Sequence, residues 1–153
     1  MGKIRNSVKA IIIRDGKLLC TKNKDQFGIF YLLPGGGQEP FENIVEALKR
    51  ECKEEISTDV FVKDILFVRD YIGRNHEFAD WDSDIHQIEY MFECELPKDA
   101  EVKNGNIPDN MQIDVEWLSV NKLDNYRIYP NMLKELLGND KMTKNKIYLG
   151  DIN

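Results

Sequence analysis

Three glutamates, Glu51, Glu54 and Glu55, are the residues of this 153-residue chain whose type and spacing could do chemistry. On a helix, at about 100° per residue, their side chains fall within an arc of roughly 100° next to the apolar side. Glu51 and Glu55 form a like-charge pair four residues apart, which destabilises a helix by about 0.2–0.5 kcal/mol. Clustered carboxylates are ligands for hard cations such as Mg²⁺ or Mn²⁺, which would relieve this repulsion. The alternative is an ordinary charged helix surface held by ion pairs.

A helix must position these carboxylates, and the sequence predicts one that begins at Asn43 and ends at about Ile56. Asn43 followed three residues later by Glu46 is typical of a capping box, and no helix-breaking residue follows before Ile56. Glu46 and Arg50 are expected to form the one favourable ion pair at a spacing of four residues. The predicted apolar arc of the helix consists of Val45, Leu48, Cys52 and Ile56.

Pro34 and three glycines, Gly35, Gly36 and Gly37, precede this helix, and we expect neither strand nor helix to run through them. A loop without Cβ atoms lets a backbone carbonyl approach a metal ion and lets phosphate oxygens pack closely. The glycines and the helix together therefore predict a site for a cation and a phosphate-containing substrate.

The spacing of these residues resembles the Nudix box of the Nudix hydrolases. The resemblance covers residues 36–58 and consists of Gly36, Glu42 and the Arg-Glu-Cys-Lys-Glu-Glu run at 50–55. Three residues depart from the family pattern: Ser57 in place of the usual glycine, Thr58 in place of an apolar residue, and Phe41 at a site that is often glycine. None of these positions carries chemistry in the family, so the implied ligand set is complete.

The resemblance implies an α/β fold, a Nudix-type α/β/α sandwich with a mixed β-sheet and the catalytic Nudix helix, in one domain over residues 1–153. It also implies metal-dependent cleavage of a pyrophosphate bond in a nucleoside diphosphate linked to another moiety, X. The alternative is a non-catalytic Nudix-fold module that binds a nucleotide or a nucleotide derivative. Nucleoside triphosphates, sugar nucleotides similar to ADP-ribose and dinucleoside polyphosphates are all open as substrates.

The same resemblance assigns roles to individual residues. Mg²⁺ or Mn²⁺ would be held by Glu51, Glu54, Glu55 and the Gly35 carbonyl. The catalytic residues would be Glu54, Glu51 and Arg50, with Arg50 orienting the carboxylates and pairing with Glu42. Gly36 and Gly37 would contact the substrate. The general base is either a helix glutamate or a carboxylate from a distant loop, and Glu89 is a candidate for a further acid, against the alternative of an ordinary exposed strand residue.

The composition of the chain limits which partners and which compartment we expect. The formal net charge of −6 argues against binding to a nucleic-acid polymer and favours a small nucleotide-type substrate. Cys20, Cys52 and Cys94 are widely spaced, which is typical of reduced thiols and not of a disulfide framework or a zinc site. No signal peptide or membrane-spanning stretch is present, so we expect the cytoplasm as the compartment.

Apolar and β-branched runs predict the strands that surround the helix. The expected strands cover residues 7–13, 17–21, 30–33, 58–71, 85–96 and 115–118, with a hairpin at Asp15-Gly16, a polar turn at 23–28 and a polar loop at 97–110. Pro130 suits the first turn of a second helix over residues 131–137, closed by Gly138. The tail, 139–153, could add an edge strand, pair with a second subunit as a homodimer, or stay loose.

The polar segment 73–84 contains two aromatic residues, Phe78 and Trp81. It is either a solvated connection whose aromatic rings pack on the domain or a second subunit, or a specificity loop whose ring stacks on a base. His76 and His86 are expected to be structural or surface groups, because hard cations prefer oxygen ligands.

Overall fold

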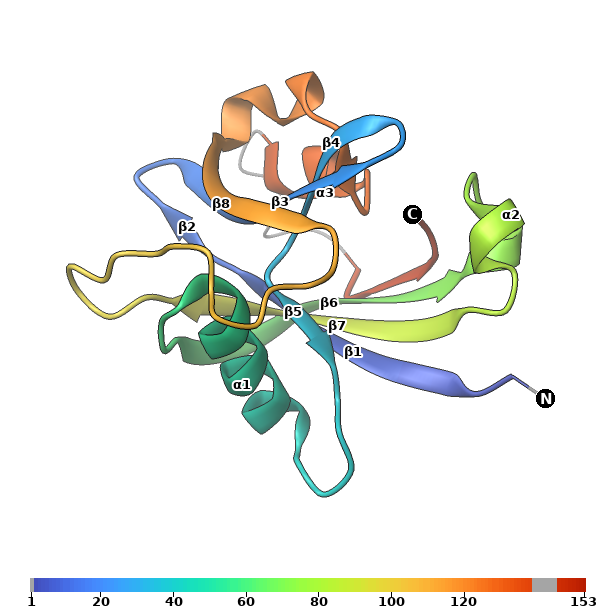
Figure 1. Cartoon of the computed structure of the whole chain (residues 1–153), viewed down its shortest axis with the longest axis horizontal. Coiled ribbons are helices and arrows are strands. Elements are labelled where there is room, and N and C mark those ends of the chain that lie inside the picture. The colour runs from blue at the N-terminus through green and yellow to red at the C-terminus, as the bar shows by residue number, and fades with distance from the viewer. Residues whose placement is uncertain (1, 139–145) are drawn as a thin grey trace.

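Strands from both halves of the chain form a five-stranded mixed sheet in the computed structural model, which describes residues 2–138 and 146–153. The order of this sheet is β10 (Tyr148–Asp151), β6 (Phe61–Ile72), β7 (His86–Glu95), β1 (Ile4–Ile11) and β5 (Gly35–Gly37). The β1–β7 and β10–β6 pairings are parallel, and the β6–β7 and β1–β5 pairings are antiparallel. Figure 1 shows these strands crossing the middle of the molecule.

A second sheet forms around the predicted hairpin. It contains β2 (Ile13–Arg14), β3 (Lys17–Asp25), β4 (Gly28–Leu32) and β9 (Ile128–Tyr129), and β8 (Gln112–Ser119) also pairs with β3. Asp15 and Gly16 connect β2 to β3 with positive φ angles of 53° and 71°, which matches a tight two-residue hairpin turn. The hairpin prediction is confirmed, although the single strand predicted over 7–13 is divided between β1 and β2.

Two strands are longer than predicted, and one of them extends into a segment that was predicted to be a turn. The turn predicted at 23–28 is wrong at its start, because β3 continues to Asp25, and β8 begins at Gln112 and not at residue 115. Asn23 is 2% exposed and pairs with Gln112, and its side-chain amide donates to the carbonyl and the hydroxyl of Thr21, each at 3.1 Å. A buried polar side chain that forms hydrogen bonds can remain in a strand, so the polarity of Asn23 misplaced the end of β3.

The expectation that no strand runs through the glycines is wrong. Gly35–Gly37 form β5 at the edge of the mixed sheet, where Ser7 pairs with Gly37 and Lys9 with Gly35. Gly35 has a φ of 141°, and a Cβ atom there would lie 2.0 Å from the carbonyl oxygen of Val8. Strand pairing therefore requires glycine at this position, because only glycine allows so close an approach of two backbones.

The long helix α1 (Ile44–Ile56) confirms the helix prediction, including its capping box. Asn43 accepts from the Glu46 backbone at 2.9 Å, and the Glu46 carboxylate accepts from the Asn43 backbone at 3.0 Å. Ala47, Leu48, Cys52 and Ile56 are buried in a core shared with β1, β3 and β7. Ser57 follows the helix with φ 60° and ψ 27°, the left-handed conformation that explains why glycine is usual there.

A second core covers the opposite side of the mixed sheet, where η2 (Val120–Asn125) and α3 (Leu133–Leu137) pack. Figure 1 shows α1 below the central strands and α3 above them, which agrees with helices on both sides of a mixed sheet. The helix predicted over 131–137 is thus confirmed in shortened form. All three cysteines are buried and unpaired, and burial raises the pKa of the Cys94 thiol to about 12.

The remaining elements connect β6 to β7 and complete the sheet edge. The segment 73–84 contains η1 (Gly73–Asn75) and α2 (Ala79–Asp82). β10 adds the edge strand that was one alternative for the tail, while residues 139–145 lie outside the described part. Among the helices that the structure describes, none combines the length and apolar character needed to cross a membrane.

Candidate functional site

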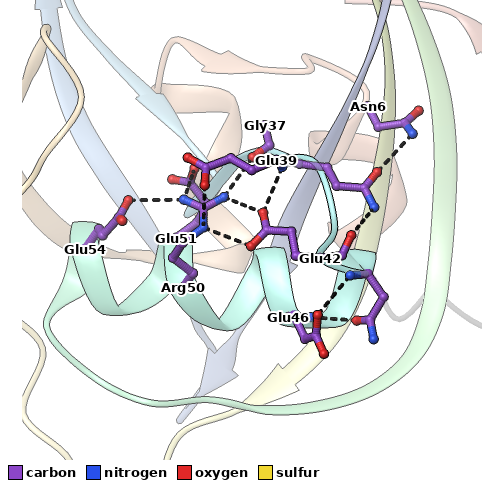
Figure 2. A network of polar contacts seen from close by, with 10 residues as sticks. Asn6, Gly37, Glu39, Glu42, Glu46, Arg50, Glu51 and Glu54 are labelled. Carbon is purple, nitrogen blue, oxygen red and sulfur yellow. Dashed lines mark hydrogen bonds and ion pairs between the residues drawn. The ribbon is translucent and has the colours of Figure 1, made fainter.

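Arg50 is the centre of a polar network on the face of α1 that turns toward β5. Its guanidinium donates to both Glu42 carboxylate oxygens, at 2.7 and 3.1 Å, and to the Gly37 carbonyl at 3.0 Å. Its Nη1 donates to Glu51 at 3.0 Å and to Glu54 at 3.4 Å. Figure 2 shows these carboxylates converging on the guanidinium from α1 and from the loop before it. The guanidinium therefore fixes two helix glutamates against the glycine strand, with Glu42 as its strongest partner.

The ion pair expected between Glu46 and Arg50 is wrong. The Glu46 carboxylate is engaged with the Asn43 backbone in the capping box, and the pair at a spacing of four residues is Arg50 with Glu54. Glu46 lies in the first turn, where a carboxylate also interacts favourably with the helix dipole. The helix end thus competes successfully for this side chain.

Glu55 lies deeper than Glu51 and Glu54, with only 2% of its surface exposed. Its carboxylate accepts from the Gly35 backbone N–H at 2.7 Å. Burial raises the pKa of Glu55 from 4.5 to about 8, although the Lys9 charge and the Gly35 hydrogen bond partly oppose this shift. The Lys9 ammonium donates to the Leu33 and Gly35 carbonyls, both at 3.3 Å. A buried carboxylate therefore faces the glycine strand with one cationic side chain near it.

The loop 97–110 docks on the C-terminal end of α1. The backbone N–H groups of Lys103, Gly105 and Ile107 donate to the carbonyls of Ile56, Glu55 and Glu54 at 3.3, 3.0 and 3.2 Å, respectively. The last carbonyls of a helix have no hydrogen-bond donors within the helix, and the backbone N–H groups of this loop serve as their donors. Each donor comes from a segment about 50 residues further along the chain, and local capping rules would not reveal it.

Asp109 in this loop is a functional candidate that the sequence analysis did not identify. Its negative charge raises the pKa values of both Glu51 and Glu55, and a hydrogen bond with Asp109 further raises that of Glu55. Burial remains the first cause of both shifts. The sequence predicted only a polar loop at 97–110, and nothing in the spacing of Asp109 relates it to the helix. It supplies a carboxylate from a distant loop, the second of the two sources considered for a general base.

The residues present fit a divalent cation. Within residues 2–138 and 146–153, no three Asp, Glu, His or Cys side chains stand arranged to hold a metal, since Arg50 engages Glu51 and Glu54 while Gly35 engages Glu55. The carboxylates of Glu51, Glu54, Glu55 and Asp109 are nevertheless neighbours, and the pKa values of Glu51 and Glu55 are raised. A bound cation would stabilise their ionised forms. A Cβ atom on Gly36 would lie 2.6–2.7 Å from the Glu51 carboxylate, so glycine leaves room for oxygen ligands against β5.

Glu89 does not belong to this carboxylate cluster. The alternative that it is an exposed strand residue is wrong, because it is 2% exposed and paired with Arg69 at 3.0 Å. Gln87 also donates to it at 3.2 Å. Glu89 instead lines the wall of a cavity of about 690 Å³ that lies between β1, β6 and the β3–β4 hairpin. Glu89 is thus engaged in a buried ion pair with Arg69.

The cavity also receives both aromatic residues of the segment 73–84. Phe78 and Trp81 line it, so the specificity-loop alternative gains a structural basis. The histidines behave as expected for structural groups: His76 contacts Asp151 at 2.6 Å and His86 contacts Asp70 at 2.8 Å.

Comparisons with known proteins identify the family of the chain. Residues 3–136 match the NUDIX domain family. The chain is 33% identical over 139 residues to the nucleoside triphosphatase NudI of Salmonella agona (strain SL483), covering 87% of this chain and 98% of that protein. A crystal structure of a NUDIX hydrolase from Nitrosomonas europaea is similar with a TM-score of 0.71 at 20% identity, covering 97% of this chain and 78% of that one.

An ADP-ribose pyrophosphatase from Streptococcus suis has a similar fold, with a TM-score of 0.60 at 16% identity, covering 96% of this chain and 98% of that one. Identities this low establish the fold alone. The domain match over most of the chain and the 33% identity to a curated relative establish the family. The chain therefore belongs to the NUDIX family and is a Nudix hydrolase.

Proposed function

We propose that this chain hydrolyses a pyrophosphate bond in nucleoside triphosphates, in a reaction that depends on Mg²⁺ or Mn²⁺. In terms of the general Nudix substrate, X is then a phosphate group. The observation that carries the proposal is the gathering of Glu51, Glu54, Glu55 and Asp109 beside β5. The similarity to a nucleoside triphosphatase along 98% of that protein supports this substrate class.

The cation would be held by Glu51, Glu54, Glu55 and the Gly35 carbonyl. When bound, it would neutralise phosphate charge and lower the pKa of a water molecule. Glu55 supports this assignment, because a carboxylate that is 2% exposed needs a compensating positive charge to ionise near neutral pH. Binding of a cation would offset that desolvation.

The protein's own residues orient the reacting groups. Arg50 would hold Glu51 and Glu54 in place, and its contact with the Gly37 carbonyl would fix β5 relative to the helix. Gly36 and Gly37 would let phosphate oxygens lie against the backbone. Lys9, at 3.3 Å from the Gly35 carbonyl, would place a positive charge beside the same phosphates.

In the chemical step, a water oxygen bonds to phosphorus while the bridging P–O bond breaks, and the leaving phosphate takes the bonding electrons. The water proton passes to a carboxylate. Asp109 supports the distant-loop alternative for this base, because it reaches Glu55 from outside the helix, while the helix glutamates are the other alternative.

The test is hydrolysis of a nucleotide panel by the purified protein, with and without Mg²⁺ or Mn²⁺, with products identified by chromatography. The panel should include nucleoside triphosphates, ADP-ribose and a dinucleoside polyphosphate. The proposal expects triphosphates to be cleaved most efficiently and only with metal. Binding of nucleotides without cleavage of any would instead favour the non-catalytic binding module.

The expected partner is a small nucleotide-type molecule in the cytoplasm, with neither a membrane nor a nucleic-acid polymer involved. The formal net charge of −6 supports this expectation, because it would repel a polyanion. A homodimer stays a prediction that light scattering would test.

A further inference from the structure

Aromatic rings from three separate segments line one part of the 690 Å³ cavity. These rings are Phe27 and Phe30 of the β3–β4 hairpin, Phe78 and Trp81 of the segment 73–84, and Tyr129 of β9. Phe27 and Trp81 meet edge to face at 5.9 Å although they are 61% and 60% exposed. Two large side chains that remain this exposed at the cavity mouth offer planar surface to a planar ligand.

A guanidinium lies among these rings. The Cζ atom of Arg127 is 5.0 Å from the ring centre of Phe30, 5.5 Å from that of Tyr129, and 5.8 Å from those of Phe27 and Phe78. Asp25 pairs with it through two hydrogen bonds of 2.9 and 2.6 Å. This contact lowers the pKa of Asp25, so the carboxylate stays ionised and cancels the charge of Arg127. A neutral end of the cavity favours an uncharged ring over a second phosphate group.

Among the described residues, Arg127 and Tyr129 keep hydrogen-bond donors that no other residue uses in this part of the cavity. A guanidinium has five N–H groups, and Arg127 uses two for Asp25 and one for the Tyr129 hydroxyl, at 2.9 Å. The Tyr129 hydroxyl accepts that bond and keeps its own proton to donate. The two side chains can therefore donate to an oxygen acceptor on the edge of a ring.

The other end of the cavity touches the proposed reaction site. Lys9 and Leu33 line it there, and the Lys9 ammonium is 3.3 Å from the Gly35 carbonyl. A ligand that fills the cavity would thus have one end beside the carboxylate cluster and the other among the aromatic rings.

We propose that the aromatic end of this cavity binds the nucleobase of the substrate, and that Arg127 and Tyr129 donate hydrogen bonds to a carbonyl oxygen of the base. Uracil, thymine, cytosine and guanine each carry a carbonyl oxygen on the ring, and adenine carries none. This inference rests on the proposed function, because it assumes a nucleotide substrate. Donors that lose their water on binding and find no acceptor on the base should disfavour adenine by about tenfold or more.

The test compares kcat/KM for UTP, GTP and ATP in wild type, Arg127→Lys and Tyr129→Phe. We expect wild type to prefer UTP and GTP over ATP by about tenfold or more, and both variants to reduce that ratio at least about threefold. Tyr129→Phe removes a single hydroxyl, so it answers the question even if Arg127→Lys loosens the loops. Arg14→Lys, which alters a guanidinium stacked on Trp117 outside the cavity, is the matched control and should keep the wild-type ratio.

A binding measurement separates this inference from the proposed function. Trp81 lines the cavity, and the only other tryptophan is Trp117, so fluorescence that is quenched in wild type but not in Trp81→Phe reports on this site. With EDTA present, uridine and guanosine should quench it at lower concentrations than adenosine does. That result without hydrolysis of any nucleotide would support the base site and refute the enzyme proposal. Hydrolysis with equal kcat/KM for ATP, GTP and UTP, or a ratio unchanged in both variants, would overturn the base-site inference.

Discussion

Replacing Gly105 with alanine should detach the loop 97–110 from the end of α1. An added Cβ atom would lie 1.7 Å from the Glu54 carbonyl oxygen and 2.4 Å from the Glu54 carbonyl carbon. Cβ atoms are not found closer than 3.0 Å to such atoms, so the backbones must separate by more than about 1 Å. The N–H···O contacts of Lys103, Gly105 and Ile107 with the helix, now 3.0–3.3 Å, would then exceed hydrogen-bond distance.

The size of the effect follows from these three hydrogen bonds. Each contributes about 0.5–1.5 kcal/mol, and water would partly replace them, so we expect a loss of about 2–4 kcal/mol in the free energy of unfolding. For a chain of this length that corresponds to a fall of about 4–16 °C in melting temperature. Asp109 would also move away from Glu55, so turnover should fall more steeply than the folded fraction does.

Urea denaturation and calorimetry of Gly105→Ala would measure this loss, with Gly138→Ala as the control. Gly138 has no atom within 4 Å of an added Cβ and a φ of −77°, so alanine should fit there without cost. If Gly105→Ala were as stable as Gly138→Ala and equally active, the docking of this loop on the helix would be refuted.

Three further predictions concern the carboxylate cluster and its helix. Millimolar Mg²⁺ or Mn²⁺ should raise the melting temperature by binding to the native state, and Glu51→Gln should shrink that rise; no change across a metal titration would count against the site. Ser57→Gly should raise the free energy of unfolding by up to about 1 kcal/mol, because it removes left-handed strain at φ 60°, and should leave turnover within about a few-fold. Since folding raises the pKa of Glu55 from 4.5 to about 8, the protonated form stabilises the fold below about pH 4.5, and this contribution disappears as the pH rises through about 8. The urea midpoint in EDTA should therefore fall over this range more in wild type than in Glu55→Gln, and parallel curves would contradict the shift.

The sequence predicted α1 well because its signals are local. The capping box of Asn43 and Glu46 and the apolar spacing of Leu48, Cys52 and Ile56 all act within a few turns. The Nudix resemblance then pointed to Arg50, Glu51, Glu54 and Glu55. In the structure, the Arg50 guanidinium contacts Glu51 and Glu54, and Glu55 accepts from the Gly35 backbone. These signals all lie within one helix and agree with one another, so this part of the candidate site could be predicted from the sequence.

What the sequence did not predict depends on contacts between distant segments. β5 consists of three glycines, whose strand conformation comes from pairing with β1 and not from any propensity of their own. Asp109 lies in a loop that docks on the helix through the backbone of Lys103, Gly105 and Ile107. The aromatic cavity likewise joins the β3–β4 hairpin, the segment 73–84 and β9, which no periodicity relates.

Glu54→Gln tests most directly whether the helix carboxylates form the catalytic metal site. Glu54 keeps 28% of its side chain exposed, and its amide replacement can still accept from Arg50, so the fold should be retained. Outer partners of metal ligands contribute about 10–100-fold to activity, so losing a ligand charge should lower kcat/KM for the best nucleotide by at least about a hundredfold. Lys49→Gln, an exposed change on the same helix, should keep wild-type activity. Near wild-type, Mg²⁺-dependent turnover by a folded Glu54→Gln protein would contradict the proposed metal site.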